Sequence, residues 1–299
     1  MGKNNASRWV ISLDVGGTSI KSGIVADGSR LLGGTRRTPI DEAGSAEAIL
    51  ATFQAVIAEA LSELNGQPLL GVGLGIPGPF DYAGGVSLIR HKFAAIYGVC
   101  LRDVIAACLP DPTAPVLFRN DAEAAIVGEA IYGVGHAYRR LIGVTLGTGL
   151  GAAFVYDGVA IREGPDVPPG GELYPVSWQG VTADDIFSIR GLLARLRALD
   201  PGVTSVAEAI RTTKAGEATL QGVFQGFGAD LGRFLTPFVR DFSAEAVIIL
   251  GGLSNAPDIE TGVRQTLAVP AMTGELGDRA AILGAAAPFF SSTKETSVP

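Results

Sequence analysis

The chain is poor in cysteine and histidine, with two residues of each among 299. Cys100 and Cys108 lie in a segment with helical periodicity, at a separation that a disulfide within one helix cannot bridge. They form no C-x-x-C pair, and His91 and His136 are isolated from each other in the chain. The sequence therefore excludes a disulfide-stabilised scaffold and offers no cysteine–histidine cluster for a metal.

Positive charge is also scarce, because 23 Lys and Arg residues against 30 Asp and Glu residues give a formal net charge of -7. No broad positive field is then available for a nucleic acid backbone or an anionic lipid surface. No stretch approaches 18 uninterrupted apolar residues, and the N-terminus lacks a basic segment leading into an apolar run with a cleavage site. We therefore expect a cytoplasmic protein that binds neither nucleic acid nor membrane.

Glycine is the residue present in excess, with 41 copies that show no three-residue period. Hydrophobic residues make up 47% of the chain, which is enough for a sizeable core divided over two domains. We therefore expect the glycines in turns and in close backbone contacts.

Hydrophobic periodicity orders the chain into two similar stretches. Short strands at 9–13, 19–25 and 30–34 form a predicted meander, and a strand–turn–strand pattern returns at 141–146 and 150–156. The repeat indicates a duplicated α/β fold. Further predicted elements are strands at 69–76, 116–118 and 246–250 and helices at 45–64, 101–109, 122–132, 183–198, 206–212, 218–239, 259–267 and 278–290.

Both copies carry a glycine-rich turn between their first two strands. Gly16-Gly17 and Gly147-Thr148-Gly149 let backbone N–H groups approach an anion closely. Taken singly, each turn also fits a tight hairpin with an incidental threonine, but the repetition favours two turns that together cradle a polyphosphate. Side chains suited to that role follow or precede them, namely the hydroxyls of Thr18 and Thr148, the charge of Lys21 and, for Mg²⁺ held through water, Asp14.

Two familiar nucleotide motifs do not apply. Gly73-x-Gly75-x-x-Gly78 matches the dinucleotide pattern, but its first two glycines lie inside a predicted strand, and the prolines at 77 and 79 cannot open the required helix. The chain has no G-x-x-x-x-G-K-[ST] sequence. Any nucleotide site must therefore use the glycine turns.

The candidate general base is Asp121, which stands where a buried strand ends and a helix begins. An acid at this position accepts N–H groups of the first helical turn, which orients its side chain. The same position also suits an aspartate that merely caps the helix, so the residues alone leave both roles open.

Five motifs in order along the chain resemble those of the ROK family of bacterial sugar kinases and related repressors, within the actin- and hexokinase-like superfamily. They read LDVGGTSIKSGIV, GLGIPGPFD, RNDAEAAIVGEA, GVTLGTGLGAAFV and VIILGGLSN. The resemblance implies a two-domain, actin-like ATPase (ribonuclease H-like) α/β fold with a cleft between duplicated domains. We expect an N-terminal domain at 1–118, joined by a C-terminal helix at 284–299, a larger domain at 119–283, and a homodimer.

The resemblance also implies ATP-dependent transfer of the γ-phosphoryl group to a sugar hydroxyl, with Asp121 as general base. Asp14 would organise Mg²⁺, and Gly251 and Gly252 would face the adenosine. The expected phosphate-binding residues are Gly16, Gly17, Thr18, Lys21, Gly147, Thr148 and Gly149, and the expected sugar-binding residues are Gly78, Lys92, Asn120, Asp121, Glu172 and Asp184.

The chain departs from the family pattern after Gly164. Family members carry E-x-G-H, then a C-x-C-G-x-x-G-C zinc cluster and a second sugar-binding acid, whereas this chain has Pro175 at the histidine position and no cysteine beyond it. We therefore predict no structural zinc. Glu172 remains, and Asp184 stands at the place of the second acid.

A glucose-like hexose is the default substrate, and an amino sugar or a cyclitol is the alternative for a kinase. A non-catalytic sugar-sensing protein on the same scaffold is the alternative from another class. Its repressor form carries an N-terminal helix-turn-helix, whereas 13 residues precede Asp14 here. An actin-like assembly ATPase would not need the acids at 172 and 184, which suit a polyol.

Overall fold

The computed structural model describes residues 8–214 and 220–290. Contacts within the chain divide it into two compact units, one running to Gly128 and resuming at Gly277, the other comprising Glu129–Leu276. The sequence-based boundaries at 118 and 284 remain predictions, and residues 291–299 of the expected C-terminal helix lie outside the described residues.

The first unit is built on a five-stranded sheet in the order β3-β2-β1-β4-β7. Strands β1, β4 and β7 are parallel, and β2 and β3 complete an antiparallel meander with β1. The strands are β1 (Trp9–Val15), β2 (Ser19–Ala26), β3 (Arg30–Pro39), β4 (Leu69–Ile76) and β7 (Val116–Asn120), with a small pair β5 (Phe80–Asp81) and β6 (Val86–Ser87). The helices are α1 (Ala46–Leu64), η1 (Ala94–Ile96), α2 (Leu101–Ala106), α3 (Asp121–Tyr132), α9 (Arg279–Ala286) and η5 (Ala287–Phe289).

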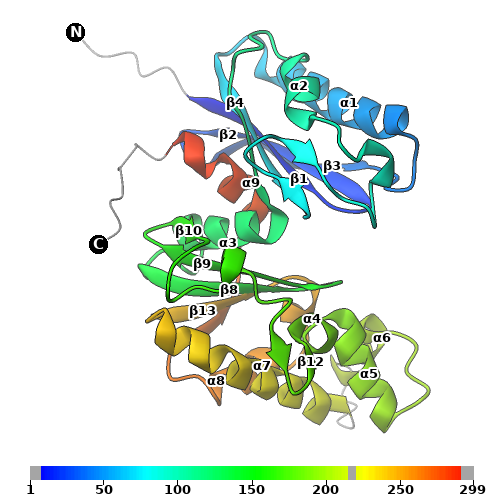
Figure 1. Cartoon of the computed structure of the whole chain (residues 1–299), viewed down its shortest axis with the longest axis vertical. Helices are drawn as coiled ribbons and strands as arrows, with labels where there is room; N and C mark the ends of the chain where they lie inside the picture. Colours follow the sequence, from blue (N-terminus) through cyan, green and yellow to red (C-terminus); the bar gives the residue numbers. More distant parts are fainter. Residues whose placement is uncertain (1–7, 215–219, 291–299) are drawn as a thin grey trace. The chain divides into compact units, whose positions relative to one another are not determined.

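Helices α1 and α9 lie on opposite sides of the first sheet (Figure 1). Ile11 and Leu13 of β1 belong to the core that α1 covers, whereas the Ser12 hydroxyl between them donates to the Ile282 carbonyl of α9 at 2.6 Å. Gly73 of β4 also faces α9, because a β-carbon there would lie 2.2 Å from the carbonyl oxygen of Ala285. Gly73 is therefore explained by the packing of α9 on the sheet. This agrees with the conclusion from the sequence that Gly73 is not part of a dinucleotide-binding motif.

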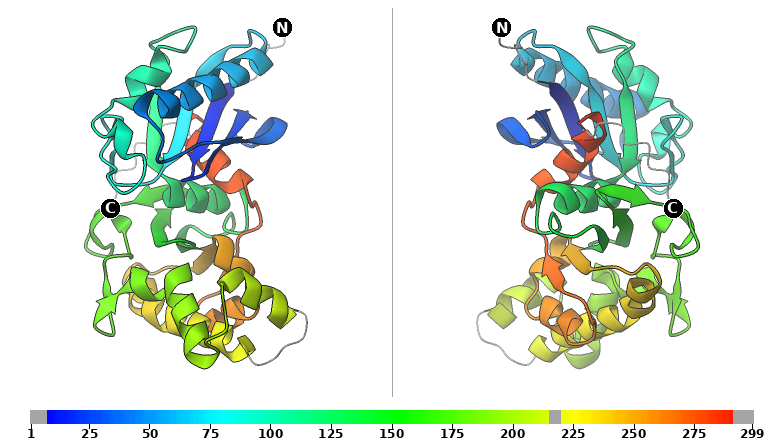
Figure 2. Two further views of the ribbon diagram at one scale, coloured as in Figure 1. Left: turned by 90° about the vertical axis from the view of Figure 1, so that its right-hand side faces the viewer. Right: turned by 90° about the vertical axis from the view of Figure 1, so that its left-hand side faces the viewer.

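The second unit contains a five-stranded sheet in the order β10-β9-β8-β13-β14, with helices α7 and α8 packed against it (Figures 1 and 2). Its strands are β8 (Arg140–Leu146), β9 (Leu150–Tyr156), β10 (Val159–Ile161), β13 (Ala246–Leu250) and β14 (Ala271–Thr273), with the pair β11 (Ser177–Trp178) and β12 (Val181–Thr182). Its helices are η2 (Pro169–Gly171), α4 (Ala183–Ile186), α5 (Ile189–Leu199), α6 (Val206–Lys214), α7 (Gln221–Asp241), η4 (Gly252–Asn255) and α8 (Ile259–Arg264).

The two sheets share one topology, which confirms the predicted duplication and the α/β fold class. In each sheet an antiparallel three-stranded meander is followed by two strands parallel to its first strand. Each glycine turn therefore joins the first two strands of its own sheet. None of the helices within residues 8–214 and 220–290 is long and apolar enough to cross a membrane.

The single helix expected at 183–198 is wrong, because the structure divides it into α4 and α5. The Ser188 hydroxyl accepts a hydrogen bond from the N–H of Gly191 and caps α5, and Ser188 itself has an extended backbone. A serine in an apparently continuous periodic segment competes for backbone hydrogen bonds and starts a new helix. The break places the first turn of α5 beside the second glycine turn.

Candidate functional site

The candidate base and the candidate metal ligand come from the carboxyl ends of the parallel strands β7 and β1, which flank β4. Asp14 is paired with Gly75 across β1 and β4, and Gly75 is paired with Arg119 across β4 and β7, so Asp121 follows directly at the same edge. A β-carbon at Gly75 would lie 3.5 Å from the Cα atom of Asp121 and 3.1 Å from the Cβ atom of Ala124. The glycine thus lets the start of α3 approach the sheet.

Asp121 has the electrostatic environment of a carboxylate that accepts protons. Burial raises its pKa above the ordinary value of 3.8, the N–H of Ala122 opposes that shift, and the negative charge of Asp14 adds to it. The positive charge of Lys92 acts in the opposite direction and places this residue close to Asp121. The structure therefore brings Asp14, Lys92 and Asp121 together in the first unit.

The helix-capping role belongs to Asn120, the residue before the candidate base. The Asn120 Oδ1 accepts from the N–H of Glu123 at 3.2 Å, whereas Asp121 Oδ1 accepts from its neighbour Ala122 at 2.9 Å. An N-cap side chain bonds to the N–H two or three residues ahead, which is the pattern shown by Asn120. The N-cap bond of α3 is therefore made by Asn120, and the base role of Asp121 stays a prediction.

Asn120 is also tied to the loop after β4. Its Nδ2 donates to the Tyr82 hydroxyl at 3.3 Å, and that hydroxyl donates to the Ile76 carbonyl at 3.3 Å. Gly78 adjoins the same group, because a β-carbon there would lie 3.3 Å from the Tyr82 hydroxyl oxygen. The predicted sugar-binding residues Gly78 and Asn120 are thus neighbours, and Tyr82 connects them.

Lys21 connects two carboxylates beside the first glycine turn. Its Nζ lies 3.1 Å from Asp14 Oδ2 and 2.9 Å from Asp278 Oδ1, and Asp278 also pairs with Arg37 at 3.0 Å. Burial lowers the pKa of Lys21, but the two carboxylates outweigh it and raise the pKa above 10.5. The ammonium is therefore charged and held near the turn.

The first turn is shaped by its own backbone. Gly16 N–H donates to Ser19 O at 2.9 Å, and Thr18 O accepts from the N–H of Ile40 at 3.1 Å. A β-carbon at Gly17 would lie 2.4 Å from a carboxylate oxygen of Glu42, so no larger residue fits while that acid stays in place. The Thr18 side chain is exposed, as a phosphate-binding hydroxyl requires.

The second glycine turn gathers a separate group of predicted residues in the second unit. Gly147 N–H donates to Gly149 O at 3.1 Å and closes the turn around Thr148. Gly251 has a φ of 90°, and a β-carbon there would lie 2.4 Å from the carbonyl oxygen of Leu146, so glycine is required. Gly251 and Gly252 therefore lie beside the strand that leads into the turn.

Two predicted sugar-binding acids have different surroundings in the second unit. The side chain of Glu172 is hydrogen-bonded to the hydroxyl of Tyr174, and partial burial raises the pKa of Glu172 above 4.5. Asp184 instead contacts the glycine turn, because its Oδ1 accepts from the N–H of Leu150 at 2.7 Å. Arg190 pairs with Asp184 Oδ2 at 3.1 Å.

The donor set suits Mg²⁺ brought in with a nucleotide. Among the described residues no group of three or more His, Cys, Asp or Glu side chains could hold a metal ion by itself. Mg²⁺ commonly binds through one or two carboxylates, several waters and substrate phosphates, so the Asp14 carboxylate beside an anion-binding turn fits it.

The family is decided by comparison with known proteins. A model of the ROK family matches residues 10–168, which is more than half of the 299 residues. The chain belongs to the ROK family. The family resemblance noted in the sequence motifs is thereby confirmed.

Relatives of this ROK protein match it over most of their length. The glucokinase of Thermotoga maritima is 27% identical over 280 residues, which cover 85% of this chain and 84% of that protein. The ROK hexokinase from Thermus thermophilus has a TM-score of 0.78 at 26% identity, covering 93% of this chain and 97% of that one. The inorganic polyphosphate/ATP-glucomannokinase from Arthrobacter sp. strain KM has a TM-score of 0.67 at 27% identity, covering 94% and 98%.

In this ROK protein an aromatic hairpin occupies the segment where the family pattern has a zinc cluster. Strands β11 and β12 turn at Gln179 and Gly180, whose φ angles are 53° and 89°. The Trp178 ring packs edge-on against Phe234 of α7 at a centroid distance of 5.6 Å, and Phe187 packs against Phe234 at 5.1 Å. Aromatic packing therefore anchors this segment to α7.

We expect the replacement of Trp178 by alanine to lower the free energy of unfolding by about 2–3 kcal/mol, because it removes a half-buried ring from this cluster. Thermal or urea unfolding measures the loss.

The purified wild-type protein should contain no stoichiometric zinc by elemental analysis, and a chelator should leave its unfolding midpoint unchanged. Stoichiometric zinc, or a midpoint lowered by the chelator, contradicts the prediction.

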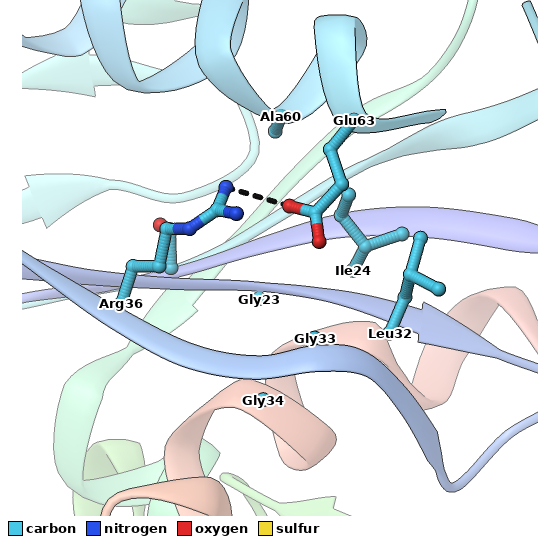
Figure 3. A pocket seen from close by; sticks show the side chains of 9 residues that line it. Gly23, Ile24, Leu32, Gly33, Gly34, Arg36, Ala60 and Glu63 are labelled. Carbon is cyan, nitrogen blue, oxygen red and sulfur yellow. Dashed lines mark ion pairs between the residues drawn. The ribbon is translucent and has the colours of Figure 1, made fainter. Parts of the chain in front are cut away.

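A small hollow between α1 and strands β2 and β3 lies in the same unit as the candidate base but involves other residues (Figure 3). Its charged side chains, Arg36 and Glu63, pair with each other at 2.6 Å. Glu63 also fills the space beside Gly33, where a β-carbon would lie 2.4 Å from its carboxylate oxygen. The hollow is therefore part of the packing of α1 on the sheet.

Sequence reasoning missed several residues that the structure adds to these groups. Tyr82 could have been noticed as an aromatic residue just after the GLGIPGPFD motif, and Tyr174 as the residue between Glu172 and the lost histidine. Asp278 carried no local signal, because its partner Lys21 is distant in the sequence, and Arg190 carried none because the break at Ser188 that brings it to Asp184 was not predicted. They are found by the pairs Lys21–Asp278 and Arg190–Asp184.

Proposed function

We infer that this ROK protein is a carbohydrate kinase, and we propose that it transfers the γ-phosphoryl group of ATP to a hydroxyl of a glucose-like hexose with Asp121 as general base. The class is supported by relatives named glucokinase, hexokinase and glucomannokinase, each matched over more than four fifths of its own length. ATP as donor is supported by the name of the glucomannokinase, which cites ATP together with inorganic polyphosphate.

The observation that carries the proposal is the position of Asp121 beside Asp14 at one edge of the first sheet. Phosphoryl transfer depends mainly on positioning and charge neutralisation around an in-line nucleophile. Asp121 would orient the sugar hydroxyl and take its proton as the hydroxyl oxygen bonds to the γ-phosphorus and the bond from that phosphorus to the bridging oxygen breaks, releasing ADP. The burial that raises the pKa of Asp121 makes its carboxylate a stronger base.

The two glycine turns would supply backbone N–H groups to the ATP phosphates. Thr18 and Thr148 add hydroxyls, and both are exposed. Asp14 would hold Mg²⁺ through water, and the metal would neutralise charge on the phosphate oxygens. Lys21 lies between Asp14 and Asp278, and its charge would act on the same oxygens. Gly251 and Gly252 would face the adenosine.

The sugar would be bound by residues near the candidate base together with Glu172. Asn120 retains one amide hydrogen beyond its bond to Tyr82, and Lys92 and Gly78 lie in the same group. In the second unit, the Tyr174 hydroxyl donates to the Glu172 carboxylate, and the remaining lone pairs of this pair offer acceptors for the hydroxyls of a polyol. These contacts suit a hexose with several free hydroxyls.

Incubation with Mg-ATP and a panel of hexoses, amino sugars and cyclitols tests the function directly. We expect sugar-dependent ADP release, with the highest kcat/KM for glucose or a close epimer. A preference for an amino sugar or a cyclitol would retain the kinase and correct the substrate. Absence of sugar-dependent ADP release from every acceptor would favour a non-catalytic sugar-sensing protein.

A further inference from the structure

We propose that Asp184 is a positioning residue for the second glycine turn, Gly147–Gly149, and that it acts on nucleotide binding and not on the sugar. The proposal rests on the proposed function in one respect, because it takes this turn to bind the phosphates of a nucleotide. It changes the role predicted for Asp184 from its place in the family pattern.

The Asp184 carboxylate lies directly against the turn. Its Oδ1 accepts from the N–H of Leu150, the residue after the turn, at 2.7 Å. A β-carbon at Gly149 would lie 2.8 Å from that same oxygen, so glycine at this position leaves the space that the carboxylate occupies. A hydrogen bond from a backbone N–H to a charged oxygen is stronger than one between neutral groups.

Arg190 compensates the charge of Asp184. Its Nη2 lies 3.1 Å from Asp184 Oδ2 and 2.7 Å from Asp185 Oδ1. An unpaired carboxylate beside an anion-binding turn would repel phosphate, and the guanidinium removes that repulsion. The pair lets an acid hold the turn at a place where negative charge must also bind.

The turn is held at both ends. At its start, the Gly147 carbonyl accepts from the N–H of Ile189, the first residue of α5, at 2.8 Å. At its end, Asp184 holds Leu150. Among the described residues no acceptor is found for the N–H groups of Thr148 and Gly149. In the proposal these two groups are the donors to the phosphate oxygens, as in a preorganised anion site.

Both Asp184 oxygens are thus engaged within the second unit, one with the turn and one with Arg190. The neighbouring Asp185 pairs with the same arginine and accepts from the Thr182 hydroxyl, whereas the N–H of Leu150 is bonded to Asp184. Asp185 therefore provides a matched control, an adjacent acid with the same arginine partner and without the bond to Leu150.

Titration of the full-length protein with MgADP, without sugar, tests the proposal whether or not the protein phosphorylates any sugar. We expect Asp184→Ala to raise the MgADP Kd by about tenfold, because it removes the bond to Leu150. Asp184→Asn should stay within about threefold of wild type, since its amide oxygen still accepts from Leu150. Asp185→Asn should bind like wild type, and the sugar KM should be unchanged in all three variants.

Removal of the compensating charge gives a second measurement on variants that keep the turn bond. Arg190→Gln should weaken MgADP binding by about threefold in the wild-type background and have a smaller effect in the Asp184→Asn background, where the residue against the turn is neutral and only Asp185 remains as a charged partner. Thermal unfolding checks that each variant is folded. The proposal is overturned if folded Asp184→Ala leaves the MgADP Kd unchanged, or if Asp185→Asn weakens MgADP binding as much as Asp184→Ala does.

Discussion

Replacement of Asp121 by asparagine is expected to lower kcat by about 10²- to 10⁴-fold while sugar binding changes little. Asparagine keeps the size of the side chain and an oxygen for the N–H of Ala122, which Asp121 holds at 2.9 Å, but it cannot take a proton. Steady-state kinetics with saturating Mg-ATP, together with direct titration of the sugar, separates turnover from binding.

Glu123 offers a matched control from the same first turn of α3. Its carboxylate is buried and pairs with Arg119 at 3.7 Å. Glu123→Gln should change kcat by no more than about threefold, because the Glu123 carboxylate pairs with Arg119 and has no proposed contact with the sugar or the nucleotide. Full activity of Asp121→Asn would eliminate Asp121 as the base.

The raised pKa of Asp121 also predicts a pH dependence. Asp121 accepts a proton only when ionised, so kcat/KM should fall as the pH drops through a value above 3.8. The residual activity of Asp121→Asn should not show this fall at low pH.

The raised pKa of Asp121 also affects stability. A folded-state pKa above the unfolded value means that the folded protein binds more protons between the two values. The contribution to stability is then present below 3.8 and lost as the pH rises through the folded pKa. Asp121→Asn should therefore unfold at a higher temperature than wild type at neutral pH.

Replacement of Asp14 by asparagine is expected to lower kcat/KM by at least about 10²-fold, since loss of a carboxylate that organises Mg²⁺ removes several kcal/mol of charge stabilisation. The Mg²⁺ concentration for half-maximal activity should rise in the same variant. Activity measured over a range of Mg²⁺ at fixed ATP gives both quantities.

Asp278 separates the metal role of Asp14 from its ion pair with Lys21. Both acids contact the Lys21 ammonium, at 3.1 Å and 2.9 Å. If release of Lys21 caused the loss, Asp278→Asn would be as inactive as Asp14→Asn. We expect Asp278→Asn to lose only a few-fold and to keep its Mg²⁺ dependence. Equal losses in the two variants would contradict the assignment of Asp14 to the metal.

Neighbouring residues show where interpretation of the sequence reached its limit. The sequence placed the end of the strand at 118 and the start of the helix at 122, whereas β7 ends at Asn120 and α3 begins at Asp121. Asp121 was considered as the cap of that helix. The backbone decides this, because Asn120 stands at the N-cap and reaches the N–H of Glu123. The break at Ser188 has the same origin, since a hydroxyl in a periodic segment is compatible with a continuous helix until the chain turns there.

Local patterns were sufficient to locate the strands, the duplicated glycine turns and the acid at the strand–helix junction, because periodicity and turn chemistry act over a few neighbouring residues. The family departure at 175 was likewise legible in the residues themselves. Only the tertiary structure showed which residues the charged side chains of Lys21 and Asp184 contact. Strand order and helix packing bring Asp278 to Lys21 and Asp184 to the turn at Gly149, and no short-range pattern encodes contacts between segments so far apart in the chain.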